Sequence, residues 1–174
     1  HEFKQKPINA HIFVGHTHWD HIQGFPFFAP AFIQGNEFTI YSLHGAEKPL
    51  EKVFRGLMDN DYFPVPLTEM KANLDFRELE SEVNLGDIQV SYMFLNHPGL
   101  AIGFRISYAG RSLVYISDHE NYGRLSPDGP GMHALDLEIA HFAGNADLLI
   151  SEAQYTEEEY KQKKGWGHST FLDA

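Results

Sequence analysis

Short apolar runs separated by turn residues recur along the chain and predict both strands and helices. The run from Ala10 to Gly15 predicts a short buried strand, and FTIYS at Phe38–Ser42 predicts another. Between these strands we expect a brief helical turn broken by Pro26, followed by a loop. Apolar residues at helical spacing, with Pro49 near the start, predict a helix over 48–58.

The second half of the chain is richer in strands. The segments LDFREL, IQVSYMFL, AIGFRISYAG and RSLVYISD each predict one, with turn residues between them. GMHALDLEIAHFAG predicts a helix closed by Gly144, and ADLLISEA predicts a buried strand. TEEEYKQKK predicts a charged helix in which Thr156 and Glu159 form a capping box. Strands followed by strand–helix alternation favour an α/β fold made of layers.

Length and composition fit a globular chain. Its 174 residues are 43% hydrophobic and 21% charged, so we expect one domain over 1–174. No apolar run reaches the length of about 18 residues that a membrane span needs. The chain begins with His1 and ends in what looks like the first turn of a helix, which predicts a fragment shortened at both ends. The cytoplasm is the default expectation for its location.

Cysteine content and net charge narrow the chemistry. The chain has no cysteine, so any metal site must be built from His, Asp and Glu. Its formal charge of −11 disfavours long nucleic acids, because their binding depends on Lys and Arg contacts to phosphate. A small anionic substrate stays compatible, since bound metal ions make the local charge more positive.

A dense histidine motif follows the first predicted strand. The segment HTHWDH places His16, His18, Asp20 and His21 within six residues. In an extended segment His16 and His18 face one side, and a sharp turn can bring His21 next to Asp20. A chain with 11 histidines produces the pattern H-x-H-x-D-H by chance only roughly 0.002 times. The motif therefore predicts metal binding, with imidazole and carboxylate ligands suited to zinc, manganese or iron.

Two further candidate ligands end apolar strands in the same way. His97 follows VSYMFLN, and Asp118 follows SLVYIS. Taken alone, His97 reads as a turn residue before a proline and Asp118 as a cap. In a chain that carries the histidine motif, we interpret both as metal ligands, because functional groups gather in loops at strand ends. His119, next to Asp118, either orients a ligand or is exposed to solvent.

Four blocks carry a resemblance to a known family: HTHWDH, FLNHPG, VYISDHE and the pair DLLISEAQY and GWGHST. With them, the chain resembles the metallo-β-lactamase-fold hydrolases and is most similar to the ribonuclease Z and cyclic-phosphodiesterase branch. The resemblance implies an αββα sandwich that lacks its first strands and its C-terminal end in this chain. It extends over residues 16–170, nearly the whole sequence.

The resemblance also implies a ligand set for two divalent metal ions, zinc first and manganese or iron as alternatives. His16, His18 and His97 would hold one ion, and Asp118 would bridge both. Asp20 and His21 would hold the second ion. A further histidine completes the second site in that branch, and no block carrying it follows Ala174.

A phosphodiester hydrolase mechanism follows from such a metal pair. Two metal ions lower the pKa of a bridging water, and the resulting hydroxide attacks phosphorus in line. By the resemblance, His168 in GWGHST would protonate the leaving oxygen, and Glu152 would orient His168. The catalytic residues expected are therefore Asp20, His168 and Glu152. The alternative is that Glu152 caps a strand and His168 is an exposed loop residue.

Aromatic residues near the motif have two readings. Phe25, Phe27, Phe28, Phe32, Tyr62 and Phe63 either wall a pocket beside the metals or belong to the core. Trp19 lies inside the motif and would shape access to it. Trp166, beside His168, would be free to stack on a base or sugar.

The expected class of substrate depends on the spacing between His97 and Asp118. Long-armed ribonuclease Z enzymes carry a basic insertion between the histidine and the aspartate that match His97 and Asp118, and they use it to grip tRNA. Here the two residues are only 118 − 97 = 21 positions apart, enough for a hairpin. We therefore expect a small phosphodiester such as a cyclic phosphate or nucleotide-like molecule. The expectations for partners are an anionic small molecule, no membrane, and compatibility with a homodimer.

Two alternatives stay open. The same site could hydrolyse an ester, lactone or thioester by attack on a carbonyl carbon. The chain could also be a non-catalytic module that binds or senses metal.

Overall fold

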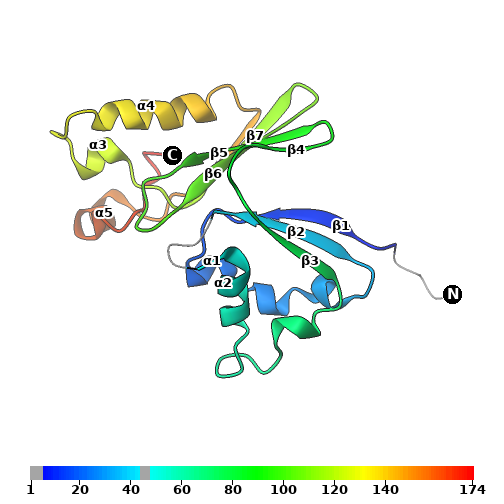
Figure 1. Ribbon diagram of the computed structural model, residues 1–174. Coiled ribbons are helices and arrows are strands. Elements are labelled where there is room, and N and C mark those ends of the chain that lie inside the picture. The colour runs from blue at the N-terminus through cyan, green and yellow to red at the C-terminus, as the bar shows by residue number, and fades with distance from the viewer. Residues whose placement is uncertain (1–5, 44–47) are drawn as a thin grey trace. The chain divides into compact units, whose positions relative to one another are not determined.

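The computed structural model describes residues 6–43 and 48–174, so His1 and His44 lie outside the described residues. The chain forms two compact units, called here the N-terminal unit (His1–Glu80) and the C-terminal unit (Ser81–Ala174). Each unit, taken by itself, is a sheet with helices packed on it (Figure 1), which confirms the predicted α/β class. The single domain expected over 1–174 stays a prediction.

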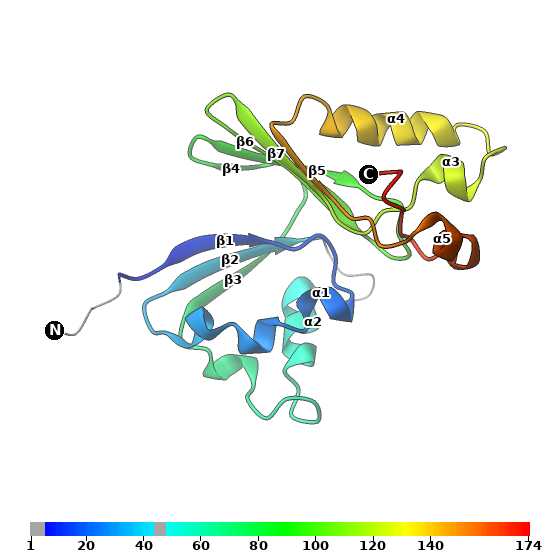
Figure 2. The same cartoon turned by 180° about the vertical axis from the view of Figure 1, so that it is seen from behind.

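A three-stranded parallel sheet forms the N-terminal unit. Its order is β1-β2-β3, with strands β1 (Asn9–Phe13), β2 (Glu37–Ser42) and β3 (Asn73–Glu78). The helices lie on one face of this sheet in both views (Figure 2). They are α1 (Trp19–Ile22), α2 (Leu50–Leu57) and the 3₁₀ helices η1 (Phe25–Phe27), η2 (Ala29–Phe32) and η3 (Leu67–Glu69).

The core of this unit fixes the helix that follows the histidine motif. Phe38 and Ile40 point to one face of β2, because side chains alternate along a strand. They pack with Ile22 of α1 and with Leu50 and Phe54 of α2, all of them buried. Burial of side chains of this size stabilises the fold by about 1.5–3 kcal/mol each. Ile22 thus anchors α1 beside the sheet and leaves the residues before it at the surface.

A five-stranded sheet forms the C-terminal unit. Its strands are β4 (Val83–Leu85), β5 (Ile88–Phe94), β6 (Ile102–Tyr108), β7 (Arg111–Ile116) and β8 (Leu148–Ser151), in that order. The β4–β7 pairs are antiparallel, and β7 pairs with β8 in parallel. The helices are α3 (Tyr122–Leu125), α4 (Met132–Ala143) and α5 (Glu157–Lys163). Ile139 of α4 packs against Val114 and Ile116 of β7, so α4 covers one face of the sheet.

Most of the expected elements are confirmed. The capping box of α5 is present: the Glu159 amide donates to Thr156 Oγ1 at 3.3 Å, and the Thr156 amide donates to Glu159 Oε2 at 2.9 Å. The sequence did not predict β4 and α3, which span only three and four residues. The stretch expected as a loop after Phe28 contains η2.

The prediction that β8 is a buried strand is wrong. Leu148, Leu149 and Ile150 are 51%, 44% and 44% exposed. The reason lies in the strand order, since β8 is an edge strand with β7 on one side. β1 is also an edge strand, and it is half-buried instead of buried. The apolar composition of these segments correctly predicted that β1 and β8 are strands, but it did not predict their positions at the edges of the sheets.

Within residues 6–43 and 48–174, none of the helices has both the length and the apolar character needed to cross a membrane.

Candidate metal centre

The histidine motif follows β1 directly, and hydrogen bonds to β2 fix the backbone just before it. The Val14 amide donates to the Tyr41 carbonyl at 2.8 Å, and Ser42 Oγ donates to the Val14 carbonyl at 2.8 Å. His18 has extended backbone angles and directly precedes α1. The His21 amide donates to the His18 carbonyl at 3.1 Å, which turns the chain back on itself.

This turn brings the motif side chains together as the N-terminal cluster, defined as His16, His18, Asp20 and His21. The ring of His16 lies 4.7 Å from that of His18 and 4.1 Å from that of His21, between centroids. His21 Nε2 is 3.4 Å from Asp20 Oδ2, the proximity that the sequence suggested. The division of these residues between two ions stays a prediction.

Three segments of the C-terminal unit form a second group, the C-terminal cluster of His97, Asp118 and His168. His97 follows β5, Asp118 follows β7, and His168 lies in the loop after α5. Each offers a ligand atom, and these atoms all lie within 4.8 Å of one another. His97 Nε2 is 3.7 Å from Asp118 Oδ2. Imidazole and carboxylate at these separations are a donor set that fits a divalent metal ion.

A backbone carbonyl orients His97 within this cluster. His97 Nδ1 is 3.0 Å from the Gly167 carbonyl oxygen, which can only accept a hydrogen bond. The Nδ1 atom therefore carries a proton, and the Nε2 atom faces the Asp118 carboxylate. Gly167 has φ +85°, and a Cβ atom there would collide with the His97 ring and with Pro98. Glycine is thus required where the loop approaches His97.

Glu120 holds the same loop from inside the unit. Its side chain is buried, with 1% exposure for the residue. Glu120 accepts hydrogen bonds from Tyr160 Oη at 2.7 Å and from the amides of Gly165 and Gly167, each at 2.9 Å. Burial and the neighbouring Glu120 carboxylate raise the pKa of the Tyr160 hydroxyl. Glu120 lies two residues after Asp118, and it therefore links α5 and the loop at Gly165 and Gly167 to the C-terminal cluster.

The amino-acid sequence alone does not single out Glu120 as a functional residue. The sequence feature that could have indicated a role for Glu120 is its position two residues after Asp118, in SDHE. A buried glutamate so close to a candidate ligand is unusual, because carboxylates are rarely fully buried unless they are paired. The sequence does not show that Glu120 is buried.

Glu152 is placed mainly by backbone amides. It accepts hydrogen bonds from the amides of Ser169 at 2.5 Å and Gln154 at 2.8 Å. Its Oε1 atom lies 3.9 Å from His168 Nδ1, too far for a hydrogen bond. Burial raises the pKa of the Glu152 carboxyl, opposed by the amide hydrogen bonds. Glu152 thus holds the backbone next to His168, and its carboxylate lies beside the His168 ring.

His119 is buried, so the exposed alternative for this residue does not hold. Its Nδ1 atom accepts a hydrogen bond from the Asn96 amide at 3.1 Å. Burial lowers the pKa of His119. The side chain thereby connects the residue after Asp118 to the residue before His97, and so ties two ligand-bearing loops together.

The aromatic run divides between core and surface. Phe25 and Phe28 pack against the Ile22–Phe38 core, and Phe32 and Phe63 pack against a second core group around Met58. Phe27 and Tyr62 are exposed, at 73% and 78%. For most of these aromatic residues, therefore, the interpretation as core residues is correct.

Trp166 is 57% exposed, and Lys163 Nζ lies 3.9 Å from its ring centroid. Its ring therefore already has a cation as a neighbour.

Comparisons with known proteins match nearly the whole chain. The family model described as "Beta-lactamase superfamily domain" matches residues 4–174. A ribonuclease Z of Lactobacillus johnsonii is 26% identical over 94% of this chain, and the chain spans 63% of that relative's length. Other ribonuclease Z sequences, such as that of Staphylococcus carnosus, match at 25% identity.

Two solved structures show the same fold. Human tRNase Z, short form, aligns with a TM-score of 0.62 at 20% identity, over 94% of this chain and 65% of the human chain. The metallo-beta-lactamase fold protein YhfI from Bacillus subtilis aligns with a TM-score of 0.60 at 20% identity, over 94% and 56%. At these identities the likeness establishes the fold and leaves the activity open.

Proposed function

Because the chain belongs to the beta-lactamase superfamily, we propose that it is a metal-dependent hydrolase that acts on a small phosphodiester. The observation that carries the proposal is the C-terminal cluster, in which a carbonyl-oriented His97 lies beside Asp118 and His168. Such an arrangement, with the ligand's second nitrogen already hydrogen-bonded, is characteristic of metal-binding histidines.

The proposed ligands come from both clusters. We assign His16, His18 and His97 to one ion, Asp20 and His21 to the other, and Asp118 to both. The support is the family match together with the donor set of each cluster. When bound, two divalent ions would polarise phosphoryl oxygens and make a water molecule more acidic. Zinc fits these nitrogen and oxygen donors, and manganese or iron are the alternatives.

The neighbours of His168 support a role as proton donor in this proposal. Its ring lies 5.2 Å from that of His97, between centroids, so it adjoins the ligand set. We propose that His168 gives a proton to the leaving oxygen, as general acid catalysis requires. Glu152 supports this role, because it fixes the Ser169 amide and places a negative charge 3.9 Å from His168 Nδ1.

A short hairpin supports a small substrate. β6 and β7 are joined by a tight turn at Ala109 and Gly110, with φ +50° and +77°, and Tyr108 pairs with Arg111. The segment between His97 and Asp118 therefore contains a simple hairpin and no basic arm. The net charge of −11 also disfavours a long polyanion. We propose a cyclic phosphate or nucleotide-like phosphodiester in preference to tRNA.

A substrate panel tests this function. We expect the chain, loaded with zinc or with manganese, to hydrolyse bis-p-nitrophenyl phosphate and cyclic nucleotides but not lactones. Asp118→Asn should abolish this activity, whereas His141→Ala, on the exposed side of α4, should retain it. Turnover of lactones without phosphodiesters would replace the proposal with carbonyl hydrolysis. Metal binding with no turnover of any substrate would favour a sensing module.

A further inference from the structure

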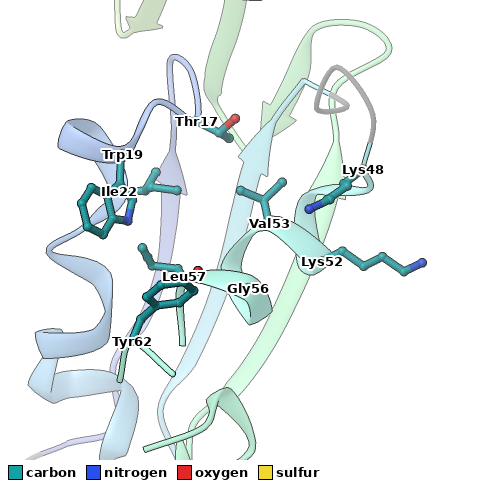
Figure 3. A pocket seen from close by; sticks show the side chains of 9 residues that line it. All are labelled: Thr17, Trp19, Ile22, Lys48, Lys52, Val53, Gly56, Leu57 and Tyr62. Carbon is teal, nitrogen blue, oxygen red and sulfur yellow. The ribbon is translucent and has the colours of Figure 1, made fainter. Parts of the chain in front are cut away.

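A groove of about 490 Å³ opens on the N-terminal unit, beside the histidine motif (Figure 3). Thr17, Trp19 and Ile22, which belong to the motif or to α1, form one wall of it. The other lining residues come from α2 and its flanks: Lys48, Lys52, Val53, Gly56, Leu57 and Tyr62. The metal-ligand assignment leaves this groove without a role.

Two exposed aromatic rings border the groove. Trp19 is 66% exposed and Tyr62 is 78% exposed, and both lie on the same side of the opening in Figure 3. Rings of this size are usually buried, since each carries a large apolar area. Exposed aromatic rings over an apolar surface are typical platforms for stacking on nucleic acid bases. Ile22, Val53 and Leu57 supply that apolar surface.

A lysine supplies positive charge at the opposite side. The ammonium group of Lys48 points toward Val53 and the groove, whereas the Lys52 side chain extends away from it (Figure 3). Among the residues that the structure describes, no carboxylate lies within ion-pair distance of Lys48. The acidic neighbour Glu51 is held by Arg55, whose Nη2 lies 2.6 Å from it. In a chain with a net charge of −11, the ammonium group of Lys48 beside the groove favours an anion there.

We propose that this groove is a nucleotide subsite, in which a base contacts Trp19 and Tyr62 and a phosphate pairs with Lys48. This subsite rests on the proposed function and specifies which small phosphodiester the hydrolase takes. Flat rings at one side and a cation at the other match a ligand that joins an aromatic base to a phosphate. Trp19 lies between His18 and Asp20 in the chain, so a base held there lies next to residues of the N-terminal cluster.

Binding can be measured apart from catalysis. Isothermal titration calorimetry with adenosine 5′-monophosphate, in EDTA and at low salt, reports the subsite without metal or turnover. We expect Trp19→Leu to weaken binding by about 5- to 150-fold, the range that loss of one base-stacking contact produces. Lys48→Met should weaken binding of the monophosphate and leave binding of adenosine unchanged. Ribose 5-phosphate, which lacks the base, should bind more weakly than the monophosphate.

A matched control separates the groove from general charge effects. Lys71→Met removes the same charge from an exposed lysine that pairs with Glu69 and does not line the groove, and it should leave binding unchanged. Equal affinities for wild type, Trp19→Leu and Lys48→Met would overturn the proposal. Stronger binding of a fatty-acid anion than of the monophosphate would also overturn it, in favour of an acyl site.

The proposed nucleotide subsite and the proposed hydrolase function can each be rejected without rejecting the other. Monophosphate binding that depends on Trp19, in a protein that hydrolyses no phosphodiester, would keep the subsite and reject the proposed function. Hydrolysis of phosphodiesters that Trp19→Leu leaves at the wild-type KM, together with no monophosphate binding, would keep the function and reject the subsite.

Discussion

The two clusters of candidate ligands are built in different ways. The N-terminal cluster is one run of six residues that a short turn folds back on itself. The C-terminal cluster joins three segments between His97 and His168, and buried polar groups such as Glu120 support it. The first depends mainly on local sequence, and the second depends on the folding of a whole unit. We therefore expect remote substitutions to disturb the second cluster more than the first.

The largest effect is expected from removing one ligand of each cluster. His16→Ala and His97→Ala should each lower hydrolysis on the order of 10³-fold, because both are assigned to the same ion. Metal content measured by elemental analysis should fall in parallel, and His141→Ala should change neither quantity. Full activity in either variant would mean that its cluster is not part of the site.

A smaller effect is expected from weakening the buried support of the C-terminal cluster. Glu120→Gln keeps the shape of the side chain but loses the charge that three donors share. It should destabilise the fold by about 1–3 kcal/mol and weaken metal binding by about 10- to 100-fold. Urea unfolding and metal titration measure the two effects, and hydrogen exchange should report faster opening at the Gly165 and Gly167 amides.

A charge-matched control sharpens this test. Glu158→Gln removes an exposed glutamate on α5 whose side chain is 82% exposed and pairs with Lys161. Exposed pairs of this kind contribute little, so stability and metal affinity should stay near the wild-type values. If Glu120→Gln behaved like this control, the loop would hold His97 without help from Glu120.

The sequence predicts the N-terminal cluster more fully than the C-terminal cluster. The HTHWDH motif could be predicted as a set of metal ligands because its residues are neighbours in the chain. The structure brings its side chains together. His97 and Asp118 were predicted from their places at strand ends in a chain that carries the histidine motif, since each alone resembles an ordinary turn residue or cap. Glu120 and the carbonyl of Gly167 were missed, because hydrogen bonds between distant segments leave no local pattern. The exposure of β8 was missed because strand order is set by tertiary pairing.

The smallest effect is expected from acid titration of the C-terminal unit. Hydrogen bonds from Arg124 and Thr170 lower the pKa of Glu157 from 4.5 to about 2. Because the folded pKa is depressed, this contribution to stability is complete above about pH 4.5 and is lost as the pH falls toward 2. Urea unfolding at pH 5 and pH 3 should show a smaller loss in Glu157→Gln than in the wild type. An equal loss in both would contradict the assignment.

The central claim is that residues of the two clusters share metal ions, and anomalous diffraction from crystals grown with zinc tests it most directly. We expect anomalous peaks whose protein ligands include His16 and His18 from one cluster and His97 and Asp118 from the other. Peaks confined to a single cluster, or a protein that takes up no zinc, would contradict the claim.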